Sequence, residues 1–247
     1  MKTVAYMALH YGKPYIQYAI RSVIDAVSEF HILYSDKPSH GYATNMVCPD
    51  TENDLHALAW ESAGLKLKWH NGDWKQENQQ RNAIAQYAPD ADIVLVVDSD
   101  EVWRPETLDL LMGNYDIYKS SYVAIPLYHF YHNFRHAMIN DPASPPRILF
   151  PKNAGMPFTV TSLKYAISHF GYCQPVEYLR YKLSCHGHKA ELRFTPDEYV
   201  AMYLDRNHWT DLHPVGHQWE RAEVVRPLDY MPAFMKEHPY FNLEWVE

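Results

Sequence analysis

The sequence predicts an α/β protein built on a doubly wound, mostly parallel sheet, and three observations support that fold class. Residues 93–97 are five consecutive β-favouring apolar residues between Pro89-Asp90 and a charged segment, which is typical of a strand buried on both faces. Three units of strand and helix precede this run, as in Rossmann-like nucleotide-binding halves. The run ends in carboxylates, and the carboxyl ends of parallel strands form the crevice in which α/β proteins bind ligands.

The first two units follow from the spacing of the apolar residues. Strands are expected at 3–9 and 30–34, with polar loops at 10–14 and 35–41 at the same edge of the sheet. Between the strands, apolar residues from Ile16 to Val27 recur at helical spacing and predict an amphipathic helix that covers the sheet.

The third unit has clearer end signals. A helix is expected to begin near Asp50 or Thr51 and to end at Gly64, a natural C-cap, before a strand at 65–69. Asp73 and Gln76 have the spacing of a capping box, so a further helix is expected to start there and to run to about residue 87.

The second half of the sequence has a less regular pattern. A short helix should open at Pro105, and strands are expected at 122–127 and 147–150. The pattern is irregular through 159–163 and 169–172, and a helix is expected at 175–183. From about residue 191 the chain is expected to be mostly helical. We therefore expect one domain at 1–190 and an extension at 191–247 packed on it.

Composition narrows the class of protein. The 247 residues suit one large α/β domain with an extension, and the net charge of −8 without a block of like charges disfavours a binder of nucleic-acid backbones. The odd cysteine count (Cys48, Cys173 and Cys185) suggests a reducing compartment. The first residues become polar too early for a signal peptide, and no apolar run has the length of a membrane span. We expect a soluble, cytoplasmic protein.

The acidic turn after the central strand is the candidate site. Asp98 and Asp100 are separated by one residue, so both can converge on one hard cation that also takes oxygens from a substrate phosphate. A solvated acidic loop is the alternative.

Two motifs in this region resemble a known family. Gln80-Arg81-Asn82, followed by the turn at 97–101, is similar to the paired "QRN" helix and Asp-x-Asp-Glu turn of family-2-like glycosyltransferases of the GT-A type. The resemblance covers roughly residues 1–190. The run His-Phe-Gly-Tyr at 169–172, with Lys182 and Gly187-His188, is more loosely similar to a block in family-17-like N-acetylglucosaminyltransferases.

The resemblance implies a metal-dependent transfer of a sugar from a nucleotide-diphosphate sugar to a hydroxyl acceptor. Mn²⁺ or Mg²⁺ would neutralise the leaving diphosphate. Asp100 is implied as its direct ligand, while Asp98 would bind the ion through water or hold the ribose. The remaining residues implied for the nucleotide and its phosphates are His10, Tyr11, Asp36, Arg81 and Ser99.

The later part of the sequence offers further candidates. His169 and either His186 or His188 would supply a further metal or phosphate contact. The catalytic base is open among three carboxylates, namely Glu177, Glu101 and Glu191, so the stereochemical outcome stays open too.

The acceptor is expected to be a glycan, a lipid-linked saccharide or a small hydroxylated compound. A hydroxymethylated DNA base is disfavoured by the acidic charge. Residues 128–132 and the Trp-rich tail are the expected contacts.

Three other interpretations of function fit parts of the sequence. The turn also matches the nucleophile motif of haloacid-dehalogenase-type phosphatases, although that family places it on the first strand. Two thiols and two imidazoles (Cys173, Cys185, His186 and His188) could form a zinc site with unusual spacing. A non-catalytic sugar- or nucleotide-binding module is the third alternative, against which the intact acidic cluster argues.

Overall fold

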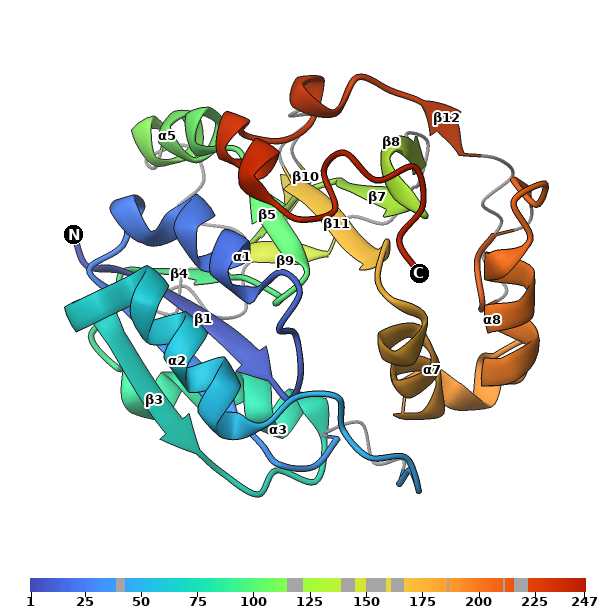
Figure 1. Ribbon diagram of the computed structural model, residues 1–247. Coiled ribbons are helices and arrows are strands. Elements are labelled where there is room, and N and C mark those ends of the chain that lie inside the picture. Colours follow the sequence, from blue (N-terminus) through green and yellow to red (C-terminus); the bar gives the residue numbers. More distant parts are fainter. Residues whose placement is uncertain are drawn as a thin grey trace.

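The computed structural model describes residues 1–38, 43–114, 122–138, 145–149, 159–160, 167–185, 187–210, 212–215 and 222–247. These residues form a mixed α/β structure with two sheets, which confirms the predicted fold class (Figure 1). The strands are β1 (Thr3–Leu9), β2 (Glu29–Tyr34), β3 (Leu67–Asn71), β4 (Ile93–Val96), β5 (Glu101–Trp103), β6 (Val123–Ala124), β7 (Leu127–Tyr131), β8 (Asn133–Met138), β9 (Pro146–Leu149), β10 (Thr159–Val160), β11 (Ile167–Tyr172) and β12 (Glu223–Val224). The α-helices are α1 (Ile16–Val23), α2 (Glu52–Ala63), α3 (Glu77–Asn82), α4 (Ile84–Tyr87), α5 (Pro105–Gly113), α7 (Val176–Cys185) and α8 (Pro196–Leu204).

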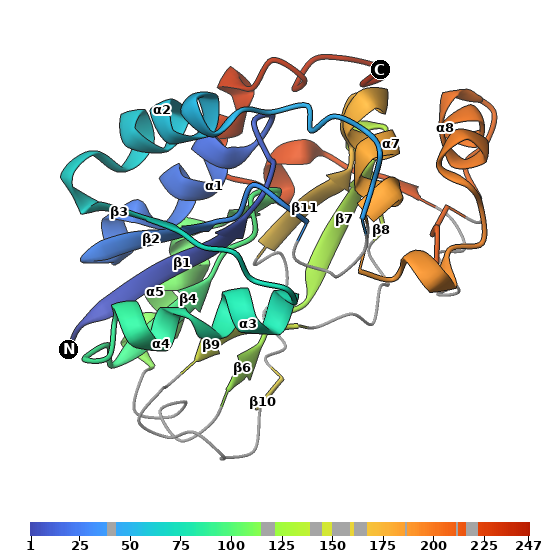
Figure 2. The ribbon, with the colours of Figure 1, turned by 90° about the horizontal axis from the view of Figure 1, so that it is seen from below.

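The first sheet has the order β10-β6-β9-β4-β1-β2-β3, and its β4-β1-β2-β3 part is parallel. Helices α1 and α2 cover one face of this part, while α3 and α4 lie on the other (Figure 2). Both faces of β4 are therefore buried: Ile93 and Leu95 contribute to the core under α1 and α2, whereas Val94 and Val96 contribute to the opposite core. This explains why the strand reads as an uninterrupted apolar run.

The ends of α2 match their sequence signals. The side chain of Thr51 caps the helix by accepting from the Asp54 N–H at 3.2 Å. Gly64 is its C-cap with φ of 52°, a backbone conformation that favours glycine.

The starts predicted for the third strand and for the helix after it are wrong. The third strand begins at Leu67 rather than 65, because a 3₁₀ turn (Gly64–Lys66) extends α2 and leaves Leu65 exposed. The expected capping box does not form: Gln76 is the N-cap of α3 without a side-chain cap bond, and Lys75 N–H instead donates to Gln79 Oε1 at 3.1 Å.

The second sheet has the order β12-β8-β7-β11-β5 and is mixed. Because β4 lies in the first sheet and β5 in the second, the acidic turn at 98–100 joins the two sheets. The strand expected at 122–127 is divided between them: β6 pairs in the first sheet and β7 in the second, and Pro126, which lacks an N–H, lies at the crossing.

The C-terminal residues are less helical than expected. Helix α8 is followed, among the described residues, by β12 and two 3₁₀ segments, η5 (Pro227–Asp229) and η6 (Ala233–Glu237). This part packs on the first 190 residues. The Val246 N–H donates to His132 O (2.9 Å), and Arg21 pairs with Glu237 (2.9 Å). In the described part of the chain, no helix combines the length and the apolar character needed to cross a membrane.

Candidate functional site

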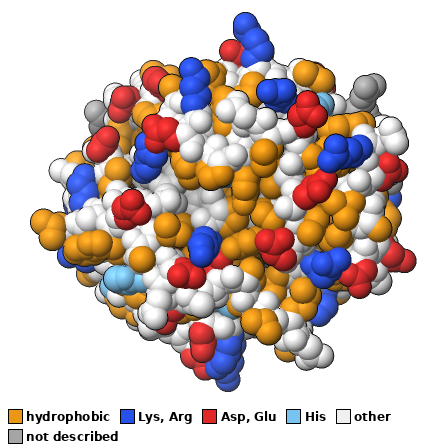
Figure 3. Space-filling model, viewed as in Figure 1, with side chains coloured by type: hydrophobic (Ala, Val, Ile, Leu, Met, Phe, Trp, Pro, Cys, Tyr) orange, Lys and Arg blue, Asp and Glu red, His pale blue; other side chains and the backbone are white. Residues whose placement is uncertain are grey.

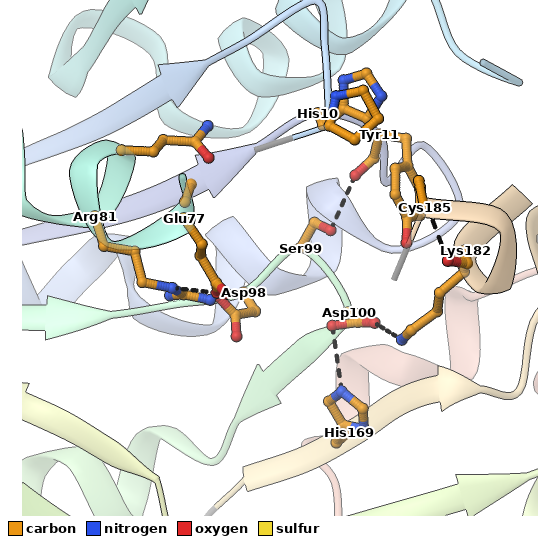
Figure 4. A pocket seen from close by; sticks show the side chains of 13 residues that line it. His10, Tyr11, Glu77, Arg81, Asp98, Ser99, Asp100, His169, Lys182 and Cys185 are labelled. Carbon is orange, nitrogen blue, oxygen red and sulfur yellow. Dashed lines mark hydrogen bonds and ion pairs between the residues drawn. The ribbon is translucent and has the colours of Figure 1, made fainter. Parts of the chain in front are cut away.

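A pocket opens at the carboxyl ends of β1 and β4, where the sequence places the acidic turn (Figure 4). Its walls come from the loops after β1, β2 and β4, from α3, from β11 and from α7. The residues that line it are Ala8, His10, Tyr11, Pro38, Glu77, Gln80, Arg81, Asp98, Ser99, Asp100, His169, Lys182 and Cys185.

Asp98 lies between two arginines. Arg81 Nη2 is 2.9 Å from its Oδ1, and Arg147 Nη2 donates to its Oδ2 at 2.9 Å. Burial by itself raises the pKa of the Asp98 carboxyl, but the two arginines outweigh that effect and lower it well below its usual range. Asp98 is therefore a stable anion that fixes the position of Arg81 at the pocket wall.

Asp100 lies between His169 and Lys182. The Lys182 Nζ donates to Asp100 Oδ2 at 3.2 Å, and His169 Nε2 is 3.5 Å from Oδ1 (Figure 4). Burial opposes ionisation of Asp100, yet Lys182 and His169 lower the pKa of its carboxyl. Burial lowers the pKa of His169 to about 4, so its imidazole is neutral at pH 7 and its unprotonated ring nitrogen can serve as a ligand.

These two side chains fit a divalent cation. Among the described residues no three His, Cys, Asp or Glu side chains are grouped so that they could hold a metal ion. A Mg²⁺-like ion that arrives with a diphosphate needs only one or two protein ligands, because phosphate and water oxygens supply the rest. One carboxylate and one neutral imidazole, at Asp100 and His169, meet that requirement.

The loop after β1 is held rigidly at the pocket. The backbone N–H groups of Gly12 and Lys13 donate to Asp50 Oδ2 at 2.7 and 2.9 Å, and the Tyr178 hydroxyl donates to Asp50 Oδ1. Ser99 Oγ donates to the Tyr11 carbonyl at 3.2 Å. Gly12 is required here, since a Cβ would lie 2.4 Å from Ser99 Oγ.

His10 links the loop after β1 to two other segments, the loop after β2 and helix α7. Its Nδ1–H donates to Ser35 O at 2.8 Å, which leaves Nε2 to accept from the Tyr181 hydroxyl at 2.7 Å. The ring of Tyr11 meets Tyr181 edge-on, with centroids 5.4 Å apart. His10 thus orients the pocket wall, and Tyr11 supplies an aromatic surface.

The helix α3 contributes a structural and a charged residue. Gln80 is buried, and its Nε2 donates to Leu33 O (2.7 Å) and Leu9 O (3.3 Å), so it ties α3 to the ends of β1 and β2. Arg81 Nε donates to Glu77 Oε1 at 2.7 Å, which holds the guanidinium beside Asp98.

Several residues expected at the site lie elsewhere. Asp36 is exposed after β2, and Glu177 is exposed at the start of α7; neither lines this pocket. Glu101 is fully buried and paired with Arg147, and burial raises its pKa to about 7. Glu191 pairs with His188 (3.1 Å) outside the pocket. The assignment of a base to Glu177, Glu101 or Glu191 stays a prediction.

Cys173 and Cys185 are both buried, and each has contacts within the protein. Cys173 packs in an apolar cluster, and the Cys185 thiol donates to Tyr181 O on its own helix at 3.3 Å. His186, the third member of the predicted zinc site, lies outside the described residues.

Three charged residues of the site had no role predicted from the sequence: Arg147, Glu77, and Lys182, which was named only as part of the block similar to family-17-like enzymes. The available signal for Lys182 was a lysine among apolar positions on α7, and for Arg147 a charge inside a short apolar strand. Gly171 is also informative, because a Cβ there would lie 2.4 Å from His169 Cε1 and 2.5 Å from Lys182 Nζ. Glycine therefore allows these two groups to flank Asp100.

Comparisons with known proteins give structural likeness only. Neither a protein-family model nor a curated protein sequence matches the chain. Residues 1–349 of S. aureus TarS show 16% identity and a TM-score of 0.46, covering 84% of this chain and 73% of that one. The same TarS segment in complex with UDP-GlcNAc shows 17% identity and a TM-score of 0.47, over 84% and 72% of the two chains.

A second protein covers less of the chain. Glucosyl-3-phosphoglycerate synthase from Mycobacterium tuberculosis, in complex with Mn²⁺, UDP and phosphoglyceric acid, shows 17% identity and a TM-score of 0.34, over 52% of this chain and 43% of that one. At these identities and TM-scores the likeness assigns neither an activity nor a ligand to this chain.

Proposed function

We propose that the protein is a GT-A-type glycosyltransferase that moves a sugar from a nucleotide-diphosphate donor to a hydroxyl acceptor with the help of Mn²⁺ or Mg²⁺. The observation that carries the proposal is the arrangement around Asp100. A carboxylate and a neutral imidazole that suit a divalent cation share one pocket, at the carboxyl ends of parallel strands, with two basic side chains: Lys182, which pairs with Asp100, and Arg81, which pairs with Asp98.

The proposed reaction exchanges one bond for another. The acceptor oxygen forms a bond to the anomeric carbon, and the bond from that carbon to the diphosphate oxygen breaks. Its electron pair leaves with the diphosphate, and the acceptor hydroxyl gives its proton to a base. Negative charge therefore develops on the diphosphate, and that is the charge the pocket must stabilise.

Different residues of the site would have different roles in the transfer. Asp100 and His169 would hold the divalent cation, which when bound neutralises charge on the diphosphate oxygens. Lys182 and Arg81 would donate to the same diphosphate. Their salt bridges to Asp100 and Asp98 keep the two basic side chains in position at the pocket. Tyr11, from the loop fixed by Asp50, would stack on the nucleotide base.

A screen for donor hydrolysis tests the proposal. The protein is incubated with a panel of nucleotide-diphosphate sugars, with and without Mn²⁺, and release of nucleoside diphosphate is measured. Mn²⁺-dependent release from one donor would support transfer and identify base and sugar. Calorimetric binding of a sugar or nucleotide that is indifferent to metal, without release, would instead support a non-catalytic binding module.

A further inference from the structure

Arg147 is a buried arginine whose guanidinium bridges the two ends of the acidic turn. Its Nη2 donates to Asp98 Oδ2 at 2.9 Å and also to Glu101 Oε1. The side chains of Arg147 and Glu101 are 8% and 0% exposed. On the face shown in Figure 3, by contrast, charged side chains are scattered over the surface, where ion pairs contribute little. A buried charge is costly unless it is paired, so the contacts of Arg147 define what it does.

The first sheet fixes Arg147 beside the turn. Strand β9 lies between β4 and β6, and its antiparallel register with β4 pairs Ile148 with Leu95. The preceding residue, Arg147, therefore lies beside the carboxyl end of β4, just before Asp98. A side chain on a strand that is paired on both edges has a well-defined position, so the guanidinium is a rigid reference point for the turn.

The turn is also closed by its own backbone. The Glu101 N–H donates to Asp98 O at 3.0 Å, and the Asp98 N–H donates to Glu101 Oε2 at 3.4 Å. Together with the bridge from Arg147, these bonds hold the two aspartates of the turn in different directions. In Figure 4, Asp98 lies beside Arg81, whereas Asp100 faces another side of the pocket.

Both carboxylate oxygens of Asp98 face a guanidinium. Oδ2 accepts from Arg147, and Oδ1 lies 2.9 Å from Arg81 Nη2. A divalent cation at Asp98 would have to displace one of these positive groups and would be repelled by the other. Asp100 differs, because one of its neighbours is the His169 imidazole, which can itself bind a cation.

We propose that Arg147 is a positioning residue that gives the two aspartates of the turn different roles. By holding Asp98 it keeps that carboxylate on Arg81, which would donate to the diphosphate, and away from the cation. Asp100 then remains as the carboxylate of the turn that holds the cation. This inference rests on the proposed glycosyl transfer and deepens it, because the sequence led us to expect Asp98 to bind the ion through water or to hold the ribose.

Calorimetry on a charge-balanced variant tests the inference. Arg147→Met combined with Glu101→Gln removes one basic and one acidic side chain. This double variant is titrated with inorganic pyrophosphate without metal and, separately, with Mn²⁺ alone. Pyrophosphate should bind about tenfold more weakly, as for the loss of one charge-assisted hydrogen bond, because the partner that fixes Arg81 is no longer held. Mn²⁺ should bind about tenfold more tightly, since the released Asp98 can join the cation.

Two further variants keep the test decisive. Glu101→Gln alone is the matched control: its amide oxygen can still accept from Arg147, so both affinities should stay at the wild-type values. Asp98→Asn alone should leave the Mn²⁺ affinity unchanged, and added to the double variant it should remove the gain in Mn²⁺ affinity. The Asp98 side chain is 23% exposed, so the single variant should fold even if the double variant does not.

Three results would overturn the inference. They are wild-type affinities in the double variant, an equal loss of both affinities as from a purely structural role, and weaker Mn²⁺ binding in Asp98→Asn alone. Failure of the proposed function is seen separately, in the screen for donor hydrolysis. If the wild-type protein releases no nucleoside diphosphate from any donor, the glycosyltransferase proposal fails. If release occurs but the double variant binds both probes as the wild type does, only the role given to Arg147 fails.

Discussion

Replacing Lys182 with methionine should change the affinities for the two charged ligands of the first pocket in opposite directions. Methionine keeps most of the aliphatic length and removes the ammonium group. In the structure that ammonium donates to Asp100 Oδ2 and to the Gly171 carbonyl, both at 3.2 Å. It therefore competes with a cation for Asp100 and offers a donor to a diphosphate.

The size of the expected change in UDP affinity follows from the type of contact that is lost. A hydrogen bond to a charged group contributes about 1.5–3 kcal/mol, which corresponds to about a 10- to 150-fold change in affinity. Metal-free binding of UDP should weaken by a factor in that range. Binding of Mn²⁺ alone should tighten, because Asp100 loses a competing positive charge within 3.2 Å.

The assay is isothermal titration calorimetry of Lys182→Met with UDP and, separately, with Mn²⁺. Lys68→Met, an exposed position on β3, controls for the loss of one positive charge. Equal UDP affinity in the Lys182 variant and the wild type, or weaker Mn²⁺ binding in the variant, would refute the dual role given to Lys182.

Three further changes test other parts of the structure. Gly171→Ala should lower donor turnover although it removes no functional group, because its Cβ would displace His169 or Lys182 from Asp100. Asp50→Ala should lower the free energy of unfolding in urea by about 1–3 kcal/mol, since two loop N–H groups lose their acceptor. Burial lowers the pKa of His238 from 6.5 to about 4, so the unfolded state takes up the proton first as the pH falls. His238 should contribute about 3 kcal/mol to the loss of stability between pH 6.5 and 4, so His238→Phe should reduce the pH dependence seen in urea titrations by that amount, while the part due to other buried histidines such as His169 remains.

Each of these changes has a contradicting result. Wild-type turnover in Gly171→Ala would show that His169 and Lys182 need no fixed position. An unfolding free energy unchanged in Asp50→Ala would mean that the loop finds other acceptors. The same pH dependence in His238→Phe as in the wild type would place the acid sensitivity at other groups.

Much of the parallel half could be predicted because its signals are local. The strands β1, β2 and β4 are apolar runs with polar ends, and α2 carries a threonine cap and a terminal glycine. The start of α3 could not be predicted, since the capping-box pattern competes with a side-chain bond from Gln79 to the Lys75 backbone. The second sheet is also beyond local signals, because the three residues of β5 pair with β11, more than sixty residues away.

The candidate site, like the fold, was predictable only where its residues lie at the ends of predicted strands. Strand ends place His10, Tyr11 and Asp100 at one edge, as the parallel pattern requires. The partners of the two aspartates depend on tertiary contacts: Lys182 lies 82 residues from Asp100, and Arg147 lies 49 residues from Asp98. No spacing rule in the sequence reports such pairs.

The central claim is that Asp100 helps to hold a cation which stabilises the departing diphosphate, and one comparison tests it most directly. Release of nucleoside diphosphate from the best donor is measured against Mn²⁺ concentration for the wild type and for Asp100→Asn, which keeps the shape and removes the charge. We predict Mn²⁺-dependent release by the wild type and a loss of at least about 100-fold in the variant. Release by Asp100→Asn at the wild-type rate, with the same Mn²⁺ dependence, would contradict the account.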